Sequence, residues 1–353
     1  MAPILGTEAV SLPPDDSYPF YITAKRYISP AFGDDPEAFT LILLHSTSFF
    51  KEAWEPTLED LVDCLSSLPI RLVRDAWVIE CPNHGASAVL NESTLQLPEY
   101  RHSFTCEKYA LAVHRFLLAG PYKGAKIDFL QRNIIGIGHS LGGVAIAILS
   151  SLQPRIPLRS IVLIEPMLSP GGREYLEELR FGLVRSAYER QDVWPDRKRA
   201  LRYLKDRDRT KLWDPRMLQS FIRYGLREHA GAKFVDTPYK GVTLCCSRDE
   251  EAAMYRDVEG PTKPVIYLNE TCSRLPVHVI FGSTNDYIPQ TVHDALIDSS
   301  SPRRFASISR VEKAGHLVPQ CAPKALANVI SQILIQEKNN CVGVKAALMG
   351  SKL

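Results

Sequence analysis

The chain has 353 residues, 45% of them hydrophobic and 23% charged, which is the composition of a globular protein with a sizeable core. Its formal net charge is only +2 and it has no basic, aromatic-rich motif, so nucleic acid is excluded as the expected partner. The eight cysteines show neither a CxxC pair nor metal-ligand spacing with histidine, which argues against a zinc site and a disulfide framework.

The two ends of the sequence bear on location. Residues 1–20 lack the basic and apolar segments of a signal peptide, and no run of eighteen apolar residues occurs, so no membrane span is expected. Ser351, Lys352 and Leu353 spell SKL, the tripeptide that the peroxisomal import receptor reads. The sequence therefore predicts a location in the peroxisomal matrix and this receptor as a partner, with residues 346–353 as the tail that presents the signal.

Apolar runs of strand length recur along the chain, and each ends in a polar or glycine-containing loop. They cover residues 39–45, 74–81, 133–139, 160–166 and 277–282. Helical segments with apolar residues at three-to-four spacing lie among them, as at 104–119 and 322–336. This alternation predicts a doubly wound, mostly parallel α/β sheet.

Residues 167–270 interrupt the alternation, because they are rich in Arg, Lys, Glu, Tyr and Trp and show helical spacing without a comparable buried strand. We expect a helical cap inserted after the sixth strand, with 1–166 and 271–345 forming the core. Residues 171–230 include fifteen cationic and ten acidic residues, an excess of five cationic ones. Arginines in this excess are candidates for binding phosphate, although basic helices are usually only solvated.

The strongest chemical signal is the sequence GIGHSLGG at 136–143, which holds a G-x-S-x-G pattern between an apolar strand and an apolar helix. That context is typical of a nucleophile elbow, in which small residues on both sides of the serine allow strand and helix to approach. Ser140 is therefore the predicted nucleophile. The backbone N–H of Leu141, and that of Thr47 in the loop after the strand at 39–45, are the predicted oxyanion donors.

A serine hydroxyl needs a neutral imidazole to become a useful nucleophile at neutral pH. His316 in VEKAGHLVP lies in a loop after a strand-like segment and before the last helix, which suits this role. His45, His84 and His139 lie near the site but have weaker claims, and the other histidines are expected to be solvated or structural. Chain order of nucleophile, acid and histidine is that of α/β-hydrolases.

Taken together, these stretches resemble the α/β-hydrolase superfamily over nearly the whole chain. LLHSTSFFKEAWEP, IECPNHGASAVLN, VLIEPML, TLCCSRDEEAAMY and the terminal SKL look like a fungal peroxisomal hydrolase group. That group includes the acyl-CoA hydrolase of mycophenolic acid biosynthesis, the yeast peroxisomal lipase and hydrolases of toxin clusters. The usual His-Gly after the third strand is His45-Ser46 here, which leaves a backbone donor available in a loop of altered shape.

The acid of the expected triad has two candidates. The superfamily commonly places it after the seventh strand, but the Gly282 and Pro289 landmarks put Asn285, an amide, at that place, and Asp286 falls one residue late. An amide cannot offset the charge of an imidazolium. Glu165 at the tip of the sixth strand can reach the same edge of the sheet, and the resembled mycophenolate hydrolase has its acid there. Glu165 is the predicted acid, and Asp286 is the alternative.

The resemblance implies a serine hydrolase that cleaves an acyl thioester, on a fungal secondary-metabolite or fatty acyl-CoA. A carboxylesterase or lipase acting on oxygen esters, or an acyl transferase or cyclase with the same triad, remains open because the acyl-enzyme is common to all. A non-catalytic scaffold with a hydrolase fold is a minor alternative. No metal or cofactor is expected, since the triad requires none, and oligomeric state is not indicated.

Overall fold

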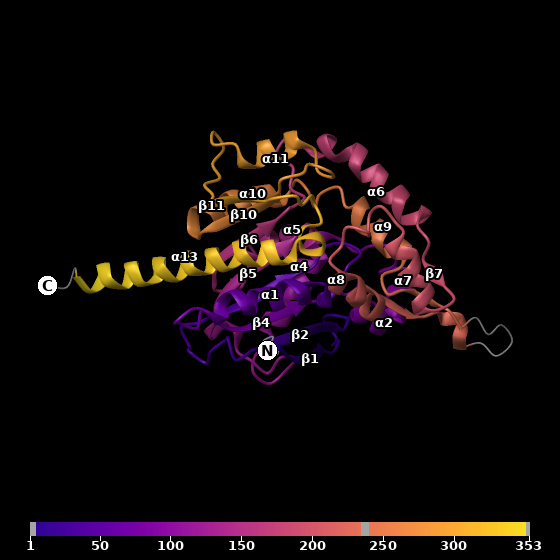
Figure 1. Ribbon diagram of the computed structural model, residues 1–353, viewed down its shortest axis with the longest axis horizontal. Coiled ribbons are helices and arrows are strands. Elements are labelled where there is room, and N and C mark those ends of the chain that lie inside the picture. Colours follow the sequence, from indigo (N-terminus) through magenta and orange to yellow (C-terminus); the bar gives the residue numbers. More distant parts are fainter. Residues whose placement is uncertain (1–4, 234–239, 351–353) are drawn as a thin grey trace.

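The computed structural model describes residues 5–233 and 240–350 and is built on an eight-stranded sheet in the order β1-β2-β4-β3-β5-β6-β10-β11 (Figure 1). The strands β1 and β2 run antiparallel to their neighbours, and all the others are parallel. This sheet confirms the predicted fold class. The strands are β1 (Gly6–Leu12), β2 (Ile22–Ile28), β3 (Phe39–Leu44), β4 (Val73–Ile79), β5 (Asn133–His139), β6 (Leu158–Ile164), β10 (Val277–Gly282) and β11 (Ser307–Val311).

The register of the parallel strands brings their carboxyl ends to one edge of the sheet. Leu44 pairs with Gly138, and His139 pairs with Ile164, so the residues that follow β3, β5 and β6 start at the same level. Gly282 at the end of β10 pairs with Val311 at the end of β11. Loops far apart in the sequence therefore meet at this edge, which is where ligands bind in open α/β sheets.

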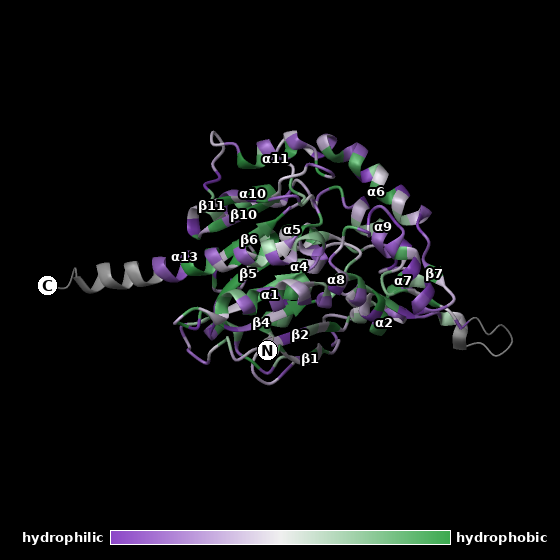
Figure 2. Cartoon of the chain, viewed as in Figure 1, coloured by the Kyte–Doolittle hydropathy of each residue, from purple (hydrophilic) through white to green (hydrophobic). Residues whose placement is uncertain are grey.

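Both faces of the sheet are covered by helices, as the continuous apolar runs of β3, β5 and β6 require. On one face, α1 (Glu55–Ser66) packs with α13 (Pro323–Gly350), and their leucines and isoleucines bury against alternate residues of β3 to β6. On the other face lie α4 (Cys106–Leu118), α5 (Leu141–Leu149) and α10 (Pro264–Arg274). Figure 2 shows the most hydrophobic residues concentrated in these central layers.

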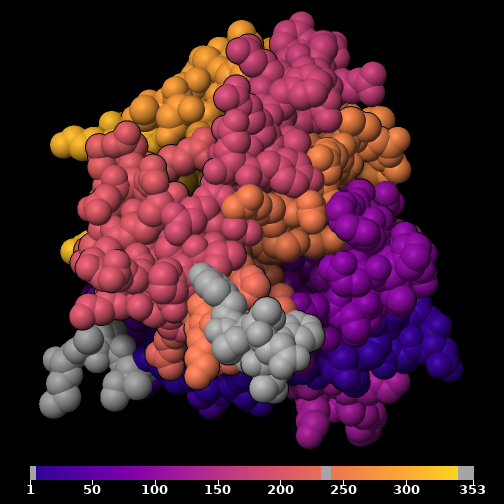
Figure 3. Space-filling model, turned by 90° about the vertical axis from the view of Figure 1, so that its right-hand side faces the viewer, coloured from indigo at the N-terminus to yellow at the C-terminus, as the bar shows by residue number. Residues whose placement is uncertain are grey.

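The insertion after β6 shares an apolar cluster with Phe49, Phe50 and Ala53 of the segment after β3, and it lies across one side of the molecule (Figure 3). It contains the helices α6 (Glu177–Glu189), α7 (Arg197–Lys205), α8 (Pro215–Ser220) and α9 (Arg248–Arg256). It also contains a small antiparallel sheet in the order β7-β9-β8, made of β7 (Val193–Trp194), β9 (Val242–Leu244) and β8 (Leu226–Glu228). These short strands were not predicted, because two or three residues carry no periodic pattern.

The expected boundary between cap and core at residue 270 falls inside α10, which packs against α5 and buries Val265 and Leu268 in the core. The division into a core and a cap stays a prediction.

Short elements complete the chain. They are α2 (Gly85–Leu90), α3 (Glu92–Leu95), α11 (Gln290–Ile297), α12 (Val318–Cys321), the 3-10 turns η1 (Lys51–Trp54), η2 (Phe129–Gln131), η3 (Arg173–Leu176) and η5 (Ala230–Lys233), and the π-helical turn η4 (Phe221–Gly225). Within residues 5–233 and 240–350, no helix combines the length and apolar character needed to cross a bilayer. Ser351, Lys352 and Leu353, the expected import signal, lie outside the described residues.

Candidate active site

Ser140 occupies a strained turn between β5 and α5. Its backbone has φ 53° and ψ −113°, in a region that L-residues with a side chain seldom adopt. The flanking glycines explain how the turn fits: a Cβ on Gly138 would lie 2.2 Å from the carbonyl oxygen of Gly142, and one on Gly142 would lie 2.3 Å from that of Leu44. The predicted elbow geometry is therefore present around Ser140.

His316 lies beside this serine and joins it to Glu165. The imidazole Nε2 is 3.0 Å from Ser140 Oγ, and Nδ1 is 3.2 Å from Glu165 Oε2. With Nδ1–H donating to the carboxylate, Nε2 is free to accept the serine proton. All three side chains are buried. The structure thus brings together the three residues that the sequence predicts as nucleophile, base and acid.

Glu165 follows β6 directly and is held from three sides. Its Oε1 accepts a hydrogen bond of 2.8 Å from the backbone N–H of Gly282, and its Oε2 faces His316 and, at 3.4 Å, the Nε2 of His293. Burial raises the pKa of this carboxyl, but hydrogen bonds from His293 and His316 outweigh burial, so that the pKa lies well below its usual range. Glu165 is therefore ionised at neutral pH.

His293 of α11 is a second imidazole on the same carboxylate. Its side chain is buried, and its ring packs 4.4 Å from that of Phe281 in β10. From the sequence we expected His293 to be solvated or structural, because the local sequence around a histidine in an amphipathic helix does not indicate which residues its side chain contacts. Only the packing of α11 beside the end of β6 places it at Glu165.

Asp286, the alternative acid, contacts the backbone of His316 instead of its ring. Its Oδ1 accepts a hydrogen bond of 2.7 Å from the His316 backbone N–H. Asn285 closes the same loop by donating from Nδ2 to the Ile288 carbonyl at 2.6 Å. Adjacent residues of this loop thus point in different directions, and neither side chain is hydrogen-bonded to the His316 imidazole.

Two aromatic rings pack against the His316 imidazole, and one hydrogen bond holds the His316 backbone. Tyr287 stacks on it with 5.2 Å between ring centroids and 11° between ring planes, and His139 packs 5.3 Å from it. His139 Nε2 also lies 2.8 Å from the His316 carbonyl oxygen, to which it donates. Burial, and to a smaller extent the nearby His316, lowers the pKa of His139 to about 3, so the His139 imidazole donates in its neutral form. Tyr287 was not identified from the sequence.

The loop after β3 places Thr47 next to Ser140. The backbone N–H groups of Thr47 and Leu141 donate to no protein acceptor in the described part of the chain. His45 shapes the loop: its Nε2 accepts from the Cys81 backbone N–H at 3.1 Å, and its Nδ1 lies 2.8 Å from the Ser46 carbonyl. Burial lowers the pKa of His45 to about 4, so the imidazole is neutral at pH 7, with one ring nitrogen as donor and the other as acceptor.

Ser48 connects the same loop to α9 of the insertion. It adopts a left-handed conformation with φ 71°, and its N–H donates to His84 Nε2 at 3.0 Å. Its hydroxyl donates to Glu251 of α9, which also forms an ion pair with Arg190 at the end of α6. The loop that carries Thr47 is thus hydrogen-bonded both to the core and to the insertion.

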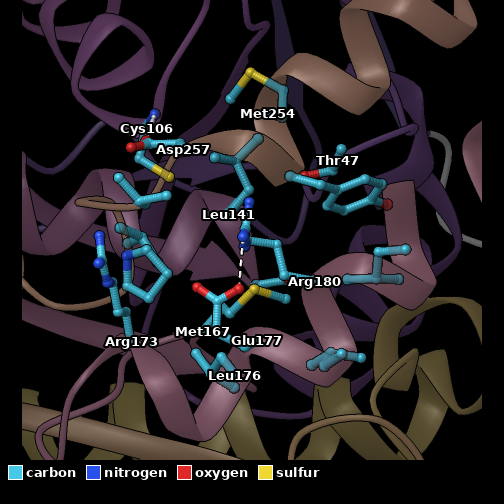
Figure 4. Close-up of a pocket in the computed structure, with 17 residues that line it drawn as sticks. Thr47, Cys106, Leu141, Met167, Arg173, Leu176, Glu177, Arg180, Met254 and Asp257 are labelled. Atoms are coloured by element: carbon cyan, nitrogen blue, oxygen red, sulfur yellow. Dashed lines mark hydrogen bonds and ion pairs between the residues drawn. The ribbon is translucent and has the colours of Figure 1, made fainter. Parts of the chain in front are cut away.

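Two pockets meet at Ser140. The narrow one, of about 40 Å³, is lined by apolar side chains such as Leu176 and Met254 together with four charged residues, Arg173, Glu177, Arg180 and Asp257. The Arg180–Glu177 ion pair of 2.5 Å lies in it (Figure 4). The wide one, of about 490 Å³, opens between the loops after β3 and β11 and the insertion after β6. Its lining includes Ser48, His316, Tyr287, Trp194, Trp213, Arg190, Arg207 and Arg209. The arrangement leaves room for a substrate on both sides of the serine.

Comparison with known proteins places the chain in context. The model of the Alpha/beta hydrolase family matches residues 41–329. The Type I acyl-CoA thioesterase mpaH of Penicillium roqueforti is 28% identical over 210 residues, 59% of this chain and 44% of that protein, so the match spans less than half of the relative. The Abhydrolase domain-containing protein AFT2-1 of Alternaria alternata is 25% identical over 245 residues, 62% of this chain and 88% of that protein.

Solved structures share the fold. The peroxisomal alpha-beta-hydrolase Lpx1 of Saccharomyces cerevisiae superposes with a TM-score of 0.72 at 17% identity, over 96% of this chain and 89% of that one. The thioesterase domain from the curacin biosynthetic pathway gives a TM-score of 0.62 at 14% identity, over 92% and 99%. At these identities the likeness establishes the architecture alone.

Proposed function

The chain belongs to the alpha/beta hydrolase family, as its motifs led us to expect, and on that premise we propose that it is a serine hydrolase that cleaves acyl thioesters of coenzyme A. One observation carries the proposal: Ser140, His316 and Glu165 form a hydrogen-bonded line at the junction of two pockets. The relatives named acyl-CoA thioesterases support the choice of a thioester.

The proposed reaction follows from this geometry. Ser140 Oγ attacks the thioester carbonyl carbon while His316 Nε2 takes the hydroxyl proton, and Glu165 stabilises the resulting imidazolium. The N–H groups of Leu141 and Thr47 serve as donors to the oxyanion. The tetrahedral intermediate expels the CoA thiolate, which receives the proton from His316. Water then attacks the acyl-enzyme in the same way, releasing the carboxylic acid and restoring Ser140.

In this proposal Glu165, and not Asp286, is the acid. The Glu165 carboxylate faces the imidazole Nδ1, whereas the Asp286 carboxylate receives the backbone N–H of the same histidine. Asp286 then acts on the position of the His316 loop. The two carboxylates have separate tasks, and single substitutions distinguish them.

The experiment is a mass-spectrometric screen of acyl-CoA thioesters, with free-thiol detection and with p-nitrophenyl esters assayed alongside. We expect CoA release by the wild type and none by Ser140→Ala, together with fluorophosphonate labelling that disappears in the same variant. Turnover of oxygen esters with no thiol release from any thioester would contradict the thioester assignment. Absence of both turnover and labelling would contradict the hydrolase assignment itself.

We also propose that the enzyme works in the peroxisome. The support is the Ser351-Lys352-Leu353 tripeptide and the likeness to a fold neighbour described as peroxisomal. A fluorescent protein fused to the N-terminus should co-localise with a peroxisomal marker in fungal cells. The same fusion without residues 351–353 should stay in the cytosol, and unchanged localisation of the truncated fusion would contradict the proposal.

A further inference from the structure

The wide pocket holds two guanidinium groups with which none of its carboxylates forms an ion pair. Three carboxylates line it, and each has a cation: Glu189 pairs with Arg185 at 2.7 Å, Asp208 pairs with Lys211 at 2.6 Å, and Glu251 pairs with Arg190. Two more arginines in the loop after α7 line the same pocket, Arg207 and Arg209. Neither forms an ion pair within residues 5–233 and 240–350. The lining itself has three arginines and three carboxylates, but Glu189 and Asp208 pair with Arg185 and Lys211 outside the pocket, which leaves the guanidinium groups of Arg207 and Arg209 without a carboxylate partner.

These two guanidinium groups are held by uncharged neighbours. Arg207 stacks 4.2 Å from the Tyr203 ring centroid. Arg209 donates to Ser186 Oγ at 2.7 Å and lies 5.8 Å from the Tyr287 ring, which itself stacks on His316. Stacking and a hydroxyl partner order a guanidinium without neutralising it, which leaves its N–H fork available to an anion.

The position of His316 decides which pocket receives the leaving group. Among the described residues, His316 lines the wide pocket and does not line the narrow one. The imidazolium must protonate the departing sulfur, so the leaving group has to lie on the imidazole side of Ser140. The acyl group is then directed to the narrow pocket, whose lining combines apolar side chains such as Leu176, Leu183 and Met254 with an ion pair.

From these observations we infer that the wide pocket is the leaving-group site and that Arg207 and Arg209 bind phosphate groups of the thiol that leaves. This inference rests on the proposed thioesterase function and adds to it the part of the protein that recognises the carrier. Phosphate accepts bidentate hydrogen bonds from arginine, and a phosphate-bearing thiol would supply the anionic partner that Arg207 and Arg209 lack. The charge belongs to the carrier and not to the acyl chain.

The test compares two thioesters with the same acyl group, one of coenzyme A and one of pantetheine, which has the same thiol arm without phosphates. The variants are Arg207→Gln, Arg209→Gln and the double substitution. Arg202→Gln is the matched control, because Arg202 is an exposed cation of the neighbouring helix α7 that lines neither pocket. Fluorophosphonate labelling of Ser140 and thermal unfolding report whether each variant keeps its fold.

We expect the double variant to lose about ten-fold or more in kcat/KM for the CoA thioester, mainly through KM, and to stay within about two-fold of the wild type on the pantetheine thioester. The loss should shrink as salt is raised, because the charges are exposed to solvent. Equal losses on both substrates, no loss on the CoA thioester, or the same loss in Arg202→Gln would overturn the inference while leaving the hydrolase intact. If the wild type hydrolysed neither thioester, the proposed function would fail and the inference with it.

Discussion

Replacing Glu165 by glutamine tests the proposed acid most directly, because the surroundings of Glu165 dictate how the amide must sit. The Gly282 N–H donates to Glu165 Oε1 at 2.8 Å, so in the glutamine variant the amide oxygen has to occupy the Oε1 position to accept this hydrogen bond. The amide NH₂ group then faces His316 Nδ1. The imidazole then accepts at Nδ1 and carries its proton on Nε2, where it can no longer accept a proton from Ser140. The substitution removes the charge that offsets the imidazolium and also imposes the wrong tautomer.

We expect Glu165→Gln to lower kcat about 10⁴-fold, the loss known for the equivalent change in a serine triad, or about 5 kcal/mol of transition-state stabilisation. Asp286→Asn is the matched control, since its Oδ1 can still accept from the His316 N–H at a cost of about 1 kcal/mol, which is within ten-fold in kcat. Both variants are assayed for thiol release and checked by thermal unfolding. A folded Asp286→Asn variant without turnover, beside an active Glu165→Gln variant, would refute the reasoning.

Three further outcomes follow from the site. Removing the second imidazole by His293→Leu should lower kcat about five-fold, since its contact of 3.4 Å with the Glu165 carboxylate stabilises that carboxylate by about 1 kcal/mol. His293→Gln should recover part of this loss. Equal activity of both variants and the wild type would show that the contact does not contribute to catalysis. Arg180→Ala removes the ion pair from the narrow pocket, so the ratio of kcat/KM for a long acyl chain to that for a short one should rise; an unchanged ratio across a chain-length series would place the acyl group elsewhere. Hydrogen bonds lower the folded-state pKa of Glu165, so the ionised carboxylate stabilises the fold fully above its unfolded pKa of about 4.3. This stabilisation is lost as pH falls through the lower folded-state pKa, and the Tm difference between wild type and Glu165→Gln should therefore be larger at pH 7 than at pH 3. A Tm difference that did not shrink at pH 3 would contradict this linkage.

The sequence was sufficient for features that local pattern determines. Buried parallel strands are continuous apolar runs, so β3, β5, β6 and β10 could be placed within about two residues. The elbow around Ser140 is equally local, because its glycines are required by the backbone contact that closes the turn. Counting from Gly282 and Pro289 excluded Asn285 as an acid and led to Glu165, which the fold brings to the imidazole.

Features that depend on contacts between distant segments could not be predicted. His293 takes its position from contacts with Glu165 and with Phe281 of β10, and Tyr287 from its stacking on His316. Nothing in their local sequence distinguishes them from surface residues. The strands β7, β8 and β9 are too short for a periodic signal. The cationic excess of the insertion was visible in the sequence, but only the arrangement of ion pairs separates Arg207 and Arg209 from the arginines that are already neutralised.

The hydrogen bond from Ser48 to Glu251 has a consequence for protein engineering. Replacing the insertion after β6 by that of another hydrolase would treat it as a separable module. In this protein a foreign insertion would leave the Ser48 hydroxyl and the left-handed turn beside Thr47 without their α9 partner. A chimaera would therefore have to carry over the carboxylate at position 251 together with its Arg190 partner, and selectivity and turnover could not be optimised independently.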